Sequence, residues 1–249
     1  MSLLEVQHVS QHFGSLVAVD NVSMAVETGE LRGLIGPNGA GKTTFFNLIS
    51  GFFRPTAGRI VLDGHDITGL APHQRVALGM ARTFQITEIF PELTVRENLR
   101  IPVELALGLR LKPWLTRAAD TEIKERIDEL IELGGLAGNA SRLVGELAHG
   151  DQRATEIMMT LALKPRLLLL DEPTAGMGSH ETYSTSVLIR KLHKHQKLTI
   201  VLVEHDMRVI FNLADRITVL AEGTVLDEGP PDDIAASEKV QAAYLGKAV

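Results

Sequence analysis

Gly36-Pro37-Asn38-Gly39-Ala40-Gly41-Lys42-Thr43-Thr44 contains the complete G-x-x-x-x-G-K-[ST] pattern of a phosphate-binding loop. Residues 31–35, which precede it, form a short and mostly apolar run, and residues 43–49 contain no helix breaker before Gly51. The stretch therefore has the order of strand, glycine-rich turn and helix that the motif requires. A chance glycine turn would rarely fill all four fixed positions, so the pattern predicts a nucleoside triphosphate site.

The residue types in this stretch suit a polyphosphate and its metal ion. Gly36, Gly39 and Gly41 let backbone N–H groups converge on phosphate oxygens, where side chains would block the approach. The amino end of the following helix adds unpaired N–H groups and a partial positive charge. Lys42 is placed to reach the β- and γ-phosphates, and the hydroxyl of Thr43 can ligate Mg²⁺.

Composition restricts the class of protein. The 249 residues, 45% hydrophobic and 22% charged, fit one globular domain or a domain with an inserted subdomain. The chain has no cysteine, which excludes disulfides and thiolate metal sites. The net charge of −6 and the absence of a Lys/Arg block argue against nucleic acid as the main partner. No apolar run is long enough for a membrane helix and residues 1–6 do not form a signal peptide, so we expect a soluble protein that reaches a membrane only through a partner.

Strand and helix patterns alternate along most of the chain. Strands are expected at residues 3–9, 17–24, 31–35, 59–62, 82–84, 167–170, 198–203 and 216–220, and helices at residues 43–49, 72–79, 151–163, 179–195 and 206–214. Residues 94–145 instead predict an all-helical insertion, which opens with a capping box between Thr94 and Glu97. Continuous apolar strands that alternate with helices indicate an α/β fold with a parallel sheet covered on both faces.

A second cluster of chemically competent residues follows the apolar run 167–170. Asp171 and Glu172 form an acidic pair at the carboxyl end of this buried strand. Asp171 suits the Mg²⁺ shell, directly or through water. Glu172 points to another side and could polarise a water molecule in line with the γ-phosphate. An acidic strand end is common by itself, but beside a complete phosphate loop it predicts a catalytic role.

Three further residues could contact a nucleotide, and each has a plainer interpretation. Phe13 could stack on adenine or belong to the core. Gln85, at the end of a predicted strand, could contact the ligand or lie in a surface loop. His205 ends the strand 198–203 and could donate a hydrogen bond to the γ-phosphate, or it could be a capped or solvated histidine.

Taken in order, these features resemble the ATP-binding subunits of ABC transporters. The resemblance extends over essentially the whole chain and is carried by the phosphate loop, Gln85, the stretch Leu147-Ala148-His149-Gly150-Asp151-Gln152-Arg153, the leucine-rich strand before Asp171-Glu172-Pro173, and His205. Residues 81–85, 93–98, 226–229 and 243–246 are most similar to the ATP-binding subunits of bacterial branched-chain amino acid importers. Related urea and lipopolysaccharide-transport subunits share much of this pattern.

The resemblance implies a fold and a domain division. The fold would be the P-loop NTPase ABC cassette, an α/β structure with a parallel sheet core, an N-terminal antiparallel β subdomain and a helical insertion. Residues 1–249 would form a single ATP-binding domain. Within it, residues 1–85 and 160–249 would be the nucleotide-binding core and about residues 90–158 the helical subdomain.

The resemblance also implies ATP and Mg²⁺ as cofactors and a role for each matching residue. One subunit would bind the nucleotide through Phe13, Gly36, Pro37, Asn38, Gly39, Ala40, Gly41, Lys42, Thr43 and Thr44, and the other through Leu147, Ala148, His149, Gly150 and Asp151. Thr43, Gln85 and Asp171 would hold the metal. Gln85 would also contact the attacking water, Glu172 would be the catalytic base, and His205 would sense the γ-phosphate.

The implied partners are a second ATP-binding subunit, identical or paralogous, in a head-to-tail dimer, and integral membrane permease subunits that dock on the helical insertion. The site of action would be the cytoplasmic face of the bacterial inner membrane, with no nucleic acid partner. Three residues depart from the family pattern. Ala148 stands where serine is usual, Asp151 where glutamine or glutamate is usual, and Gly178 where aspartate or asparagine is usual.

Other functions remain open at this point. The cargo could be urea or lipopolysaccharide with the same ATPase chemistry. A soluble ABC ATPase that acts on DNA or ribosomes would typically carry two cassettes or a long coiled coil, whereas this chain has one cassette and no sustained heptads. A P-loop kinase or GTPase is disfavoured by the stretch 147–153 and by His205.

Overall fold

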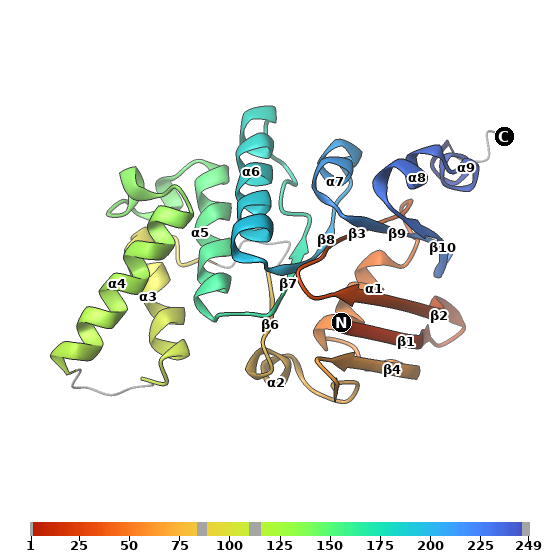
Figure 1. The fold of residues 1–249 in the computed structure, drawn as a ribbon, viewed down its shortest axis with the longest axis horizontal. Helices are drawn as coiled ribbons and strands as arrows, with labels where there is room; N and C mark the ends of the chain where they lie inside the picture. The colour runs from red at the N-terminus through yellow and green to blue at the C-terminus, as the bar shows by residue number, and fades with distance from the viewer. Residues whose placement is uncertain (1, 84–88, 110–115, 246–249) are drawn as a thin grey trace.

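The structure is a computed structural model that describes residues 2–83, 89–109 and 116–245 (Figure 1). A six-stranded sheet has the strand order β10 (Thr224–Gly229), β9 (Arg216–Ala221), β3 (Leu31–Ile35), β8 (Thr199–Val203), β7 (Leu167–Asp171) and β6 (Met80–Arg82). A four-stranded sheet has the order β2 (Leu16–Glu27), β1 (Ser2–Phe13), β4 (Ala57–Leu62) and β5 (His65–Asp66).

The described α-helices lie around these two sheets. They are α1 (Lys42–Ser50), α2 (Pro72–Ala77), α3 (Val95–Ala106), α4 (Arg117–Leu133), α5 (His149–Ala162), α6 (Ser179–Gln196), α7 (Met207–Leu213), α8 (Pro231–Ala236) and α9 (Glu238–Leu245), with 3-10 turns at Ala137–Asn139 and Val144–Glu146. Figure 1 shows α3, α4 and α5 grouped at one end of the molecule and the four-stranded sheet toward the other. In the described ranges, no helix is both long and apolar enough to span a bilayer.

The central strands divide their side chains between two hydrophobic cores. All residues of β3, β7 and β8 are buried. Leu168 and Leu170 belong to one cluster, which also contains the apolar residues of α3 to α7, whereas Leu167 and Leu169 belong to the other, which also contains Phe45 of α1. Successive side chains of a strand point to opposite faces, so a continuous apolar run can be buried on both sides. The predicted sheet with two covered faces is confirmed.

The six-stranded sheet is parallel from β6 to β9, but β10 runs antiparallel to β9. The strand β10 and the two helices that follow it were not predicted from the sequence. The residues 224–229 alternate only weakly in burial, and their strand conformation depends on pairing with β9. A second difference concerns β6, which comprises Met80–Arg82, so Thr83 of the predicted strand 82–84 is not part of it, and Phe84 lies outside the described residues. Its position is fixed by pairing of Met80 with Leu167 at the edge of the sheet.

In the described part of 94–145 the regular elements are helices and 3-10 turns, joined by turns and irregular segments, with one isolated bridge between Thr94 and Leu143. The predicted capping box is present, since the Thr94 hydroxyl accepts from the Glu97 N–H at 3.2 Å and the Glu97 carboxylate accepts from the Thr94 N–H at 2.8 Å. The apolar stripe of α4 is buried in the same cluster as the central strands. The helical region and the sheet therefore share one core.

Arg75 of α2 is a buried arginine that caps the carboxyl end of α1. Its guanidinium donates to the carbonyls of Leu48 and Ile49 at 2.8 and 2.6 Å. The last carbonyls of a helix have no partner within the helix, so these bonds satisfy two of them. Burial lowers the pKa of Arg75 to about 10, which leaves it charged at neutral pH. The helix that follows the phosphate-binding loop is thus held at its far end by a cation.

Asp215 connects three elements at the amino edge of the central sheet. It accepts from the Leu31 N–H at 2.9 Å and from Lys194 Nζ at 3.1 Å, and it lies 2.9 Å from His193 Nε2. Burial by itself would raise the pKa of Asp215, but the hydrogen bonds from Leu31 and Lys194 and the neighbouring His193 hold it below its usual value.

Replacement of Asp215 by Asn should therefore remove part of the acid sensitivity of the fold. A carboxylate with a lowered folded-state pKa stabilises the protein above its unfolded pKa of about 3.9, and this stability is lost as the pH falls through the folded pKa. We expect Asp215→Asn to cost roughly 1 kcal/mol at pH 7, because the side chain is partly exposed, and clearly less at about pH 3, below the unfolded pKa. Urea denaturation at a series of pH values measures this difference. Glu122→Gln, an exposed change in α4, is the control, and equal losses at both pH values would contradict the prediction.

Candidate active site

The loop 36–41 joins the buried strand β3 to helix α1 and closes around the side chain of Lys42. Lys42 is only 6% exposed, and its Nζ donates to the carbonyls of Gly36 and Pro37 at 2.7 and 3.0 Å. Asn38, Gly39 and Thr43 are exposed, while Pro37 and Thr44 are partly exposed and Ala40 is buried. Burial lowers the pKa of Lys42, and the charge of Glu172 partly opposes this shift. The loop thus surrounds a partly desolvated cation, as an anion-binding loop requires.

Two glycines of the loop are required by close backbone approaches, which the sequence did not reveal. A Cβ on Gly36, at φ 154°, would lie 2.1 Å from the carbonyl oxygen of Leu220, and a Cβ on Gly41, at φ 94°, would lie 2.4 Å from that of Ala18. Only Gly39, at φ 78°, has open space where its Cβ would be. Close packing is thus a second reason for glycine at Gly36 and Gly41, beside the predicted approach of phosphate. Gly36 and Gly41 allow β9 and β2 to pack against the loop.

Asp171 and Glu172 lie at the carboxyl end of β7 and point to different partners. Asp171 is 4% exposed, and its Oδ2 accepts from Arg82 Nη2 at 2.7 Å. Burial raises the pKa of Asp171, and the hydrogen bond and charge of Arg82 oppose this effect. Glu172 adopts a left-handed conformation at φ 45°, which is uncommon for a residue with a side chain. Its carboxylate has a different partner from that of Asp171.

The Glu172 carboxylate meets His205, which follows β8. Glu172 Oε1 lies 2.8 Å from His205 Nε2. The neighbouring strands β7 and β8 are parallel, so the residues that follow them come together at one edge of the sheet. The charge of Glu172 also acts on Lys42, which brings the acidic pair and the phosphate-binding loop into one site. His205 is thus a partner of Glu172, and its side chain is still 49% exposed.

Phe13 ends β1 and is 43% exposed, so it is not a core residue. Its ring packs edge-to-face on Phe53, with centroids 5.4 Å apart. The hairpin that carries Phe13 continues into β2, and the carbonyl of Ala18 in β2 touches the loop at Gly41. An exposed aromatic ring therefore lies on a hairpin that contacts the phosphate-binding loop.

The segment 147–151 opens α5. Leu147 is buried, and Ala148 is the N-cap without a side-chain hydrogen bond. The Gly150 N–H donates to Glu181 Oε1 at 3.3 Å, and Asp151 accepts from Asn139 at 2.7 Å. Figure 1 shows α5 beside α4 and α6, whereas α1 lies across the central sheet. The segment also contains His149. It therefore lies in a different part of the molecule from the phosphate-binding loop. Gln85, the remaining predicted site residue, lies outside the described residues.

A buried carboxylate next to the Glu172–His205 pair was not predicted from the sequence. Glu204 is 4% exposed and accepts from the Thr174 N–H and hydroxyl at 2.8 and 2.6 Å and from the His205 N–H at 3.0 Å. It ties the loop after Glu172 to the end of β8. The only signal in the sequence was its place directly before His205, which does not identify its partners.

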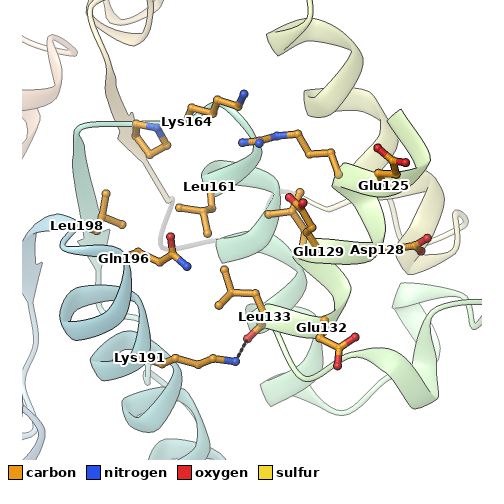
Figure 2. A pocket seen from close by; sticks show the side chains of 13 residues that line it. Glu125, Asp128, Glu129, Glu132, Leu133, Leu161, Lys164, Lys191, Gln196 and Leu198 are labelled. Atoms are coloured by element: carbon orange, nitrogen blue, oxygen red, sulfur yellow. Dashed lines mark hydrogen bonds between the residues drawn. The ribbon is translucent and has the colours of Figure 1, made fainter. Parts of the chain in front are cut away.

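A separate hollow of about 930 Å³ contains none of the predicted site residues. Figure 2 shows it between α4, α6 and the chain that leads into β7, with Lys191 Nζ donating to the Leu133 carbonyl at 3.1 Å. Lys164 and Leu198 line it and precede β7 and β8, so it lies at the amino edge of the central sheet. The phosphate-binding loop and the acidic pair lie at the carboxyl edge, where α/β sheets bind ligands.

Family models and a similar protein together match nearly the whole chain. A family model described as ABC transporter matches residues 19–175, and one described as branched-chain amino acid ATP-binding cassette transporter matches residues 228–249. The chain is 42% identical over 251 residues to LivG of Salmonella typhimurium, a high-affinity branched-chain amino acid transport ATP-binding protein, with 99% of this chain and 98% of LivG covered.

Solved structures of ATP-binding cassettes are similar as well. The structure superposes on MJ1267, an ATP-binding cassette of an ABC transporter, with a TM-score of 0.86 and 29% identity, covering 99% of this chain and all of that one. A dimeric structure of MJ0796, a bacterial ABC transporter cassette, matches with a TM-score of 0.76 and 25% identity, covering 92% of this chain and 98% of that one.

The buried position of Glu204 generates a prediction about stability. Glu204→Ala should lower the free energy of unfolding by about 2–4 kcal/mol, because it removes the acceptor of the two buried Thr174 donors and of the partly buried His205 N–H. Thr174→Val removes one hydroxyl donor and should cost about 1 kcal/mol. Urea denaturation of the two variants and the parent measures both values. A loss below that of Thr174→Val would show that Glu204 does not hold the loop.

Proposed function

The chain belongs to the ABC transporter family as an ATP-hydrolysing cassette, and from this premise we propose that it powers a bacterial importer of branched-chain amino acids. The similarity to LivG over 99% of the chain, together with the matching tail at 228–249, carries this proposal. The cargo does not touch a cassette of this kind, so the proposal rests on relatives and not on a cargo site.

We assign ATP to the space around the loop 36–41. The exposed N–H groups near Gly39, the amino end of α1 and Lys42 supply donors for the phosphates. Thr44 would add a hydroxyl beside Lys42, and the exposed ring of Phe13 would stack on the adenine. Support comes from the burial of Lys42, whose ammonium now bonds to loop carbonyls and is available to exchange them for phosphate oxygens.

The donor set fits Mg²⁺ carried by the nucleotide. Among the described residues no group of three His, Asp or Glu side chains could hold a metal alone. Mg²⁺ in such enzymes is bound by one or two protein oxygens and the substrate phosphates, and the Thr43 hydroxyl and the Asp171 carboxylate are oxygen donors of that kind. We propose these two residues and Gln85 as its ligands. The ion would neutralise charge on the phosphates during transfer.

Hydrolysis requires a base for the attacking water, and we propose Glu172. Its carboxylate would accept a proton from the water as the water oxygen bonds to the γ-phosphorus and the bond to the ADP oxygen breaks, which yields ADP and phosphate. His205 holds this carboxylate through the 2.8 Å contact and would also sense the γ-phosphate. Gln85 would contact the same water.

We propose that each complete site needs two subunits. The segment 147–151 lies apart from the phosphate-binding loop of its own chain, and dimers are known among related cassettes. The second subunit, identical or paralogous, would present Leu147, Ala148, His149, Gly150 and Asp151 to the nucleotide. Ala148, Asp151 and Gly178 would weaken this contribution, because a hydroxyl donor, a longer side chain and a polar residue are missing at these three positions.

Our proposal divides the chain into a core of residues 1–85 and 160–249 and a helical subdomain at about 90–158. The helical subdomain would dock on integral membrane permease subunits, which places the protein at the cytoplasmic face of the inner membrane. Movement at Gln85 would link the nucleotide state to the permease.

The identity of the transported substrate is tested with the intact complex of the cassette and its permease subunits. The chain should co-purify with permease subunits from its own cells, and in proteoliposomes the complex should take up radiolabelled leucine with ATP supplied on the cassette side. A complex that transports urea but not leucine would assign the other cargo. A cassette that hydrolyses ATP yet associates with no membrane subunit would exclude the transport role.

Replacement of the proposed base provides the test of the shared site. Glu172→Gln should lower the rate of ATP hydrolysis about 100-fold or more. It should also trap the closed dimer, because the nucleotide remains intact between the subunits. Light scattering of the purified variant should show a doubled mass with ATP and Mg²⁺ and a monomer without them. A variant that binds ATP and stays monomeric would point to a paralogous second subunit.

A further inference from the structure

We propose that Arg82 is a positioning residue that sets the metal affinity of the ATP site by fixing the carboxylate of Asp171. Arg82 is the last residue of β6 and lies between the phosphate-loop helix and the end of β7. This inference rests on the proposed function, since it requires Asp171 to serve as a metal ligand.

Among the described residues, three side chains accept hydrogen bonds from the Arg82 guanidinium. Nη2 donates to Asp171 Oδ2 at 2.7 Å, and Nη1 donates to Asn47 Oδ1 at 2.6 Å and Ser50 Oγ at 2.7 Å. The ion pair is largely removed from solvent, with side chains 11% and 6% exposed. An Arg–carboxylate contact of this kind is directional, and burial strengthens it relative to one in water.

Two aromatic rings hold the same guanidinium. The Cζ atom lies 4.8 Å from the centroid of Phe46 and 5.2 Å from that of Phe52. A planar guanidinium stacks on rings while its edge makes hydrogen bonds, and a lysine ammonium cannot do both. The orientation of Arg82, and with it the direction of its bond to Asp171, is therefore fixed from several sides.

The contacts of Arg82 connect the two proposed metal ligands. Thr43, Asn47 and Ser50 are spaced by four and three residues on α1, so they share one face of the helix. Arg82 bonds to two of them and to Asp171, which couples the helix of Thr43 to the end of β7. The backbone of Asp171 is fixed as well, because Arg153 Nη2 donates to its carbonyl at 2.9 Å.

Residues that orient a metal ligand usually change metal affinity by 10- to 100-fold when they are replaced. The direction of the effect separates two roles of Arg82. If it positions Asp171, its loss weakens metal binding. If it competes with the metal for the carboxylate, its loss strengthens metal binding.

The test measures metal binding directly. Mn²⁺ serves as the probe, and its free concentration is measured by electron paramagnetic resonance in the presence of the full-length chain and the β,γ-imido analogue of ATP. Arg82→Gln and Arg82→Lys should each raise the Mn²⁺ dissociation constant about tenfold or more. The affinity for the nucleotide without metal should stay within about twofold, because the described contacts of Arg82 are with Asp171, Asn47, Ser50 and two aromatic rings and not with a proposed phosphate ligand.

Arg75→Lys is the matched control, since Arg75 is also buried and also holds α1 but has no described contact with Asp171. It should lower the melting temperature and leave the Mn²⁺ dissociation constant unchanged. Phe52→Leu, at a ring that is 49% exposed, removes one stacking partner and should fold even if the Arg82 variants do not. It should weaken Mn²⁺ binding by a smaller factor than Arg82→Lys.

The inference would be overturned if Arg82→Gln bound Mn²⁺ as tightly as the parent or more tightly. If the Arg82 variants do not fold, the same result in Phe52→Leu would overturn it. An equal loss of Mn²⁺ affinity in Arg75→Lys would overturn it as well. A parent protein that binds the nucleotide without any metal dependence would instead overturn the proposed function. The two failures are therefore distinguishable.

Discussion

The carboxyl ends of β3, β7 and β8 lie at one edge of a sheet that is buried on both faces, and the site depends on this constraint. Because side chains alternate, a slip of one residue in β7 would move Leu168 and Leu170 into the wrong core. The register is therefore fixed by packing on both sides. It brings the loop after β3, the acidic pair after β7 and His205 after β8 into one place.

The charges of this site are compensated within the protein. Lys42 bonds to loop carbonyls, Asp171 pairs with Arg82, and Glu204 accepts three hydrogen bonds. A buried charge without partners would cost several kcal/mol, so these contacts are conditions for folding as well as features of the site. Lys42 and Asp171, which we propose to meet the nucleotide and its metal ion, are held in place by interactions inside the chain. The site is thus organised before a nucleotide arrives.

The helical region belongs to the same cooperative structure. Its apolar residues share one hydrophobic cluster with the faces of β3, β7 and β8, and α5 leads from the segment 147–151 into β7. Arg153 of α5 donates to the carbonyl of Asp171, and Gly150 bonds to Glu181 of α6. A displacement of α5 would therefore change the contacts of Asp171, which gives a physical route between the two halves of the shared site that we propose.

The sequence by itself determined the features that depend on neighbours in the chain. The motif at 36–44, the capping box of Thr94 and the apolar run of β7 predicted the phosphate-binding loop, a helix start and a strand buried on both faces. Three features depend on the tertiary structure: the formation of strand β10, the close packing that requires glycine at position 36, and the partners of Arg82 and Glu204. Asp171 lies 89 residues from Arg82, and Thr174 lies 30 residues from Glu204. Local patterns record the conformation of a segment, whereas such contacts arise only when distant segments pack together, so no local pattern can specify them.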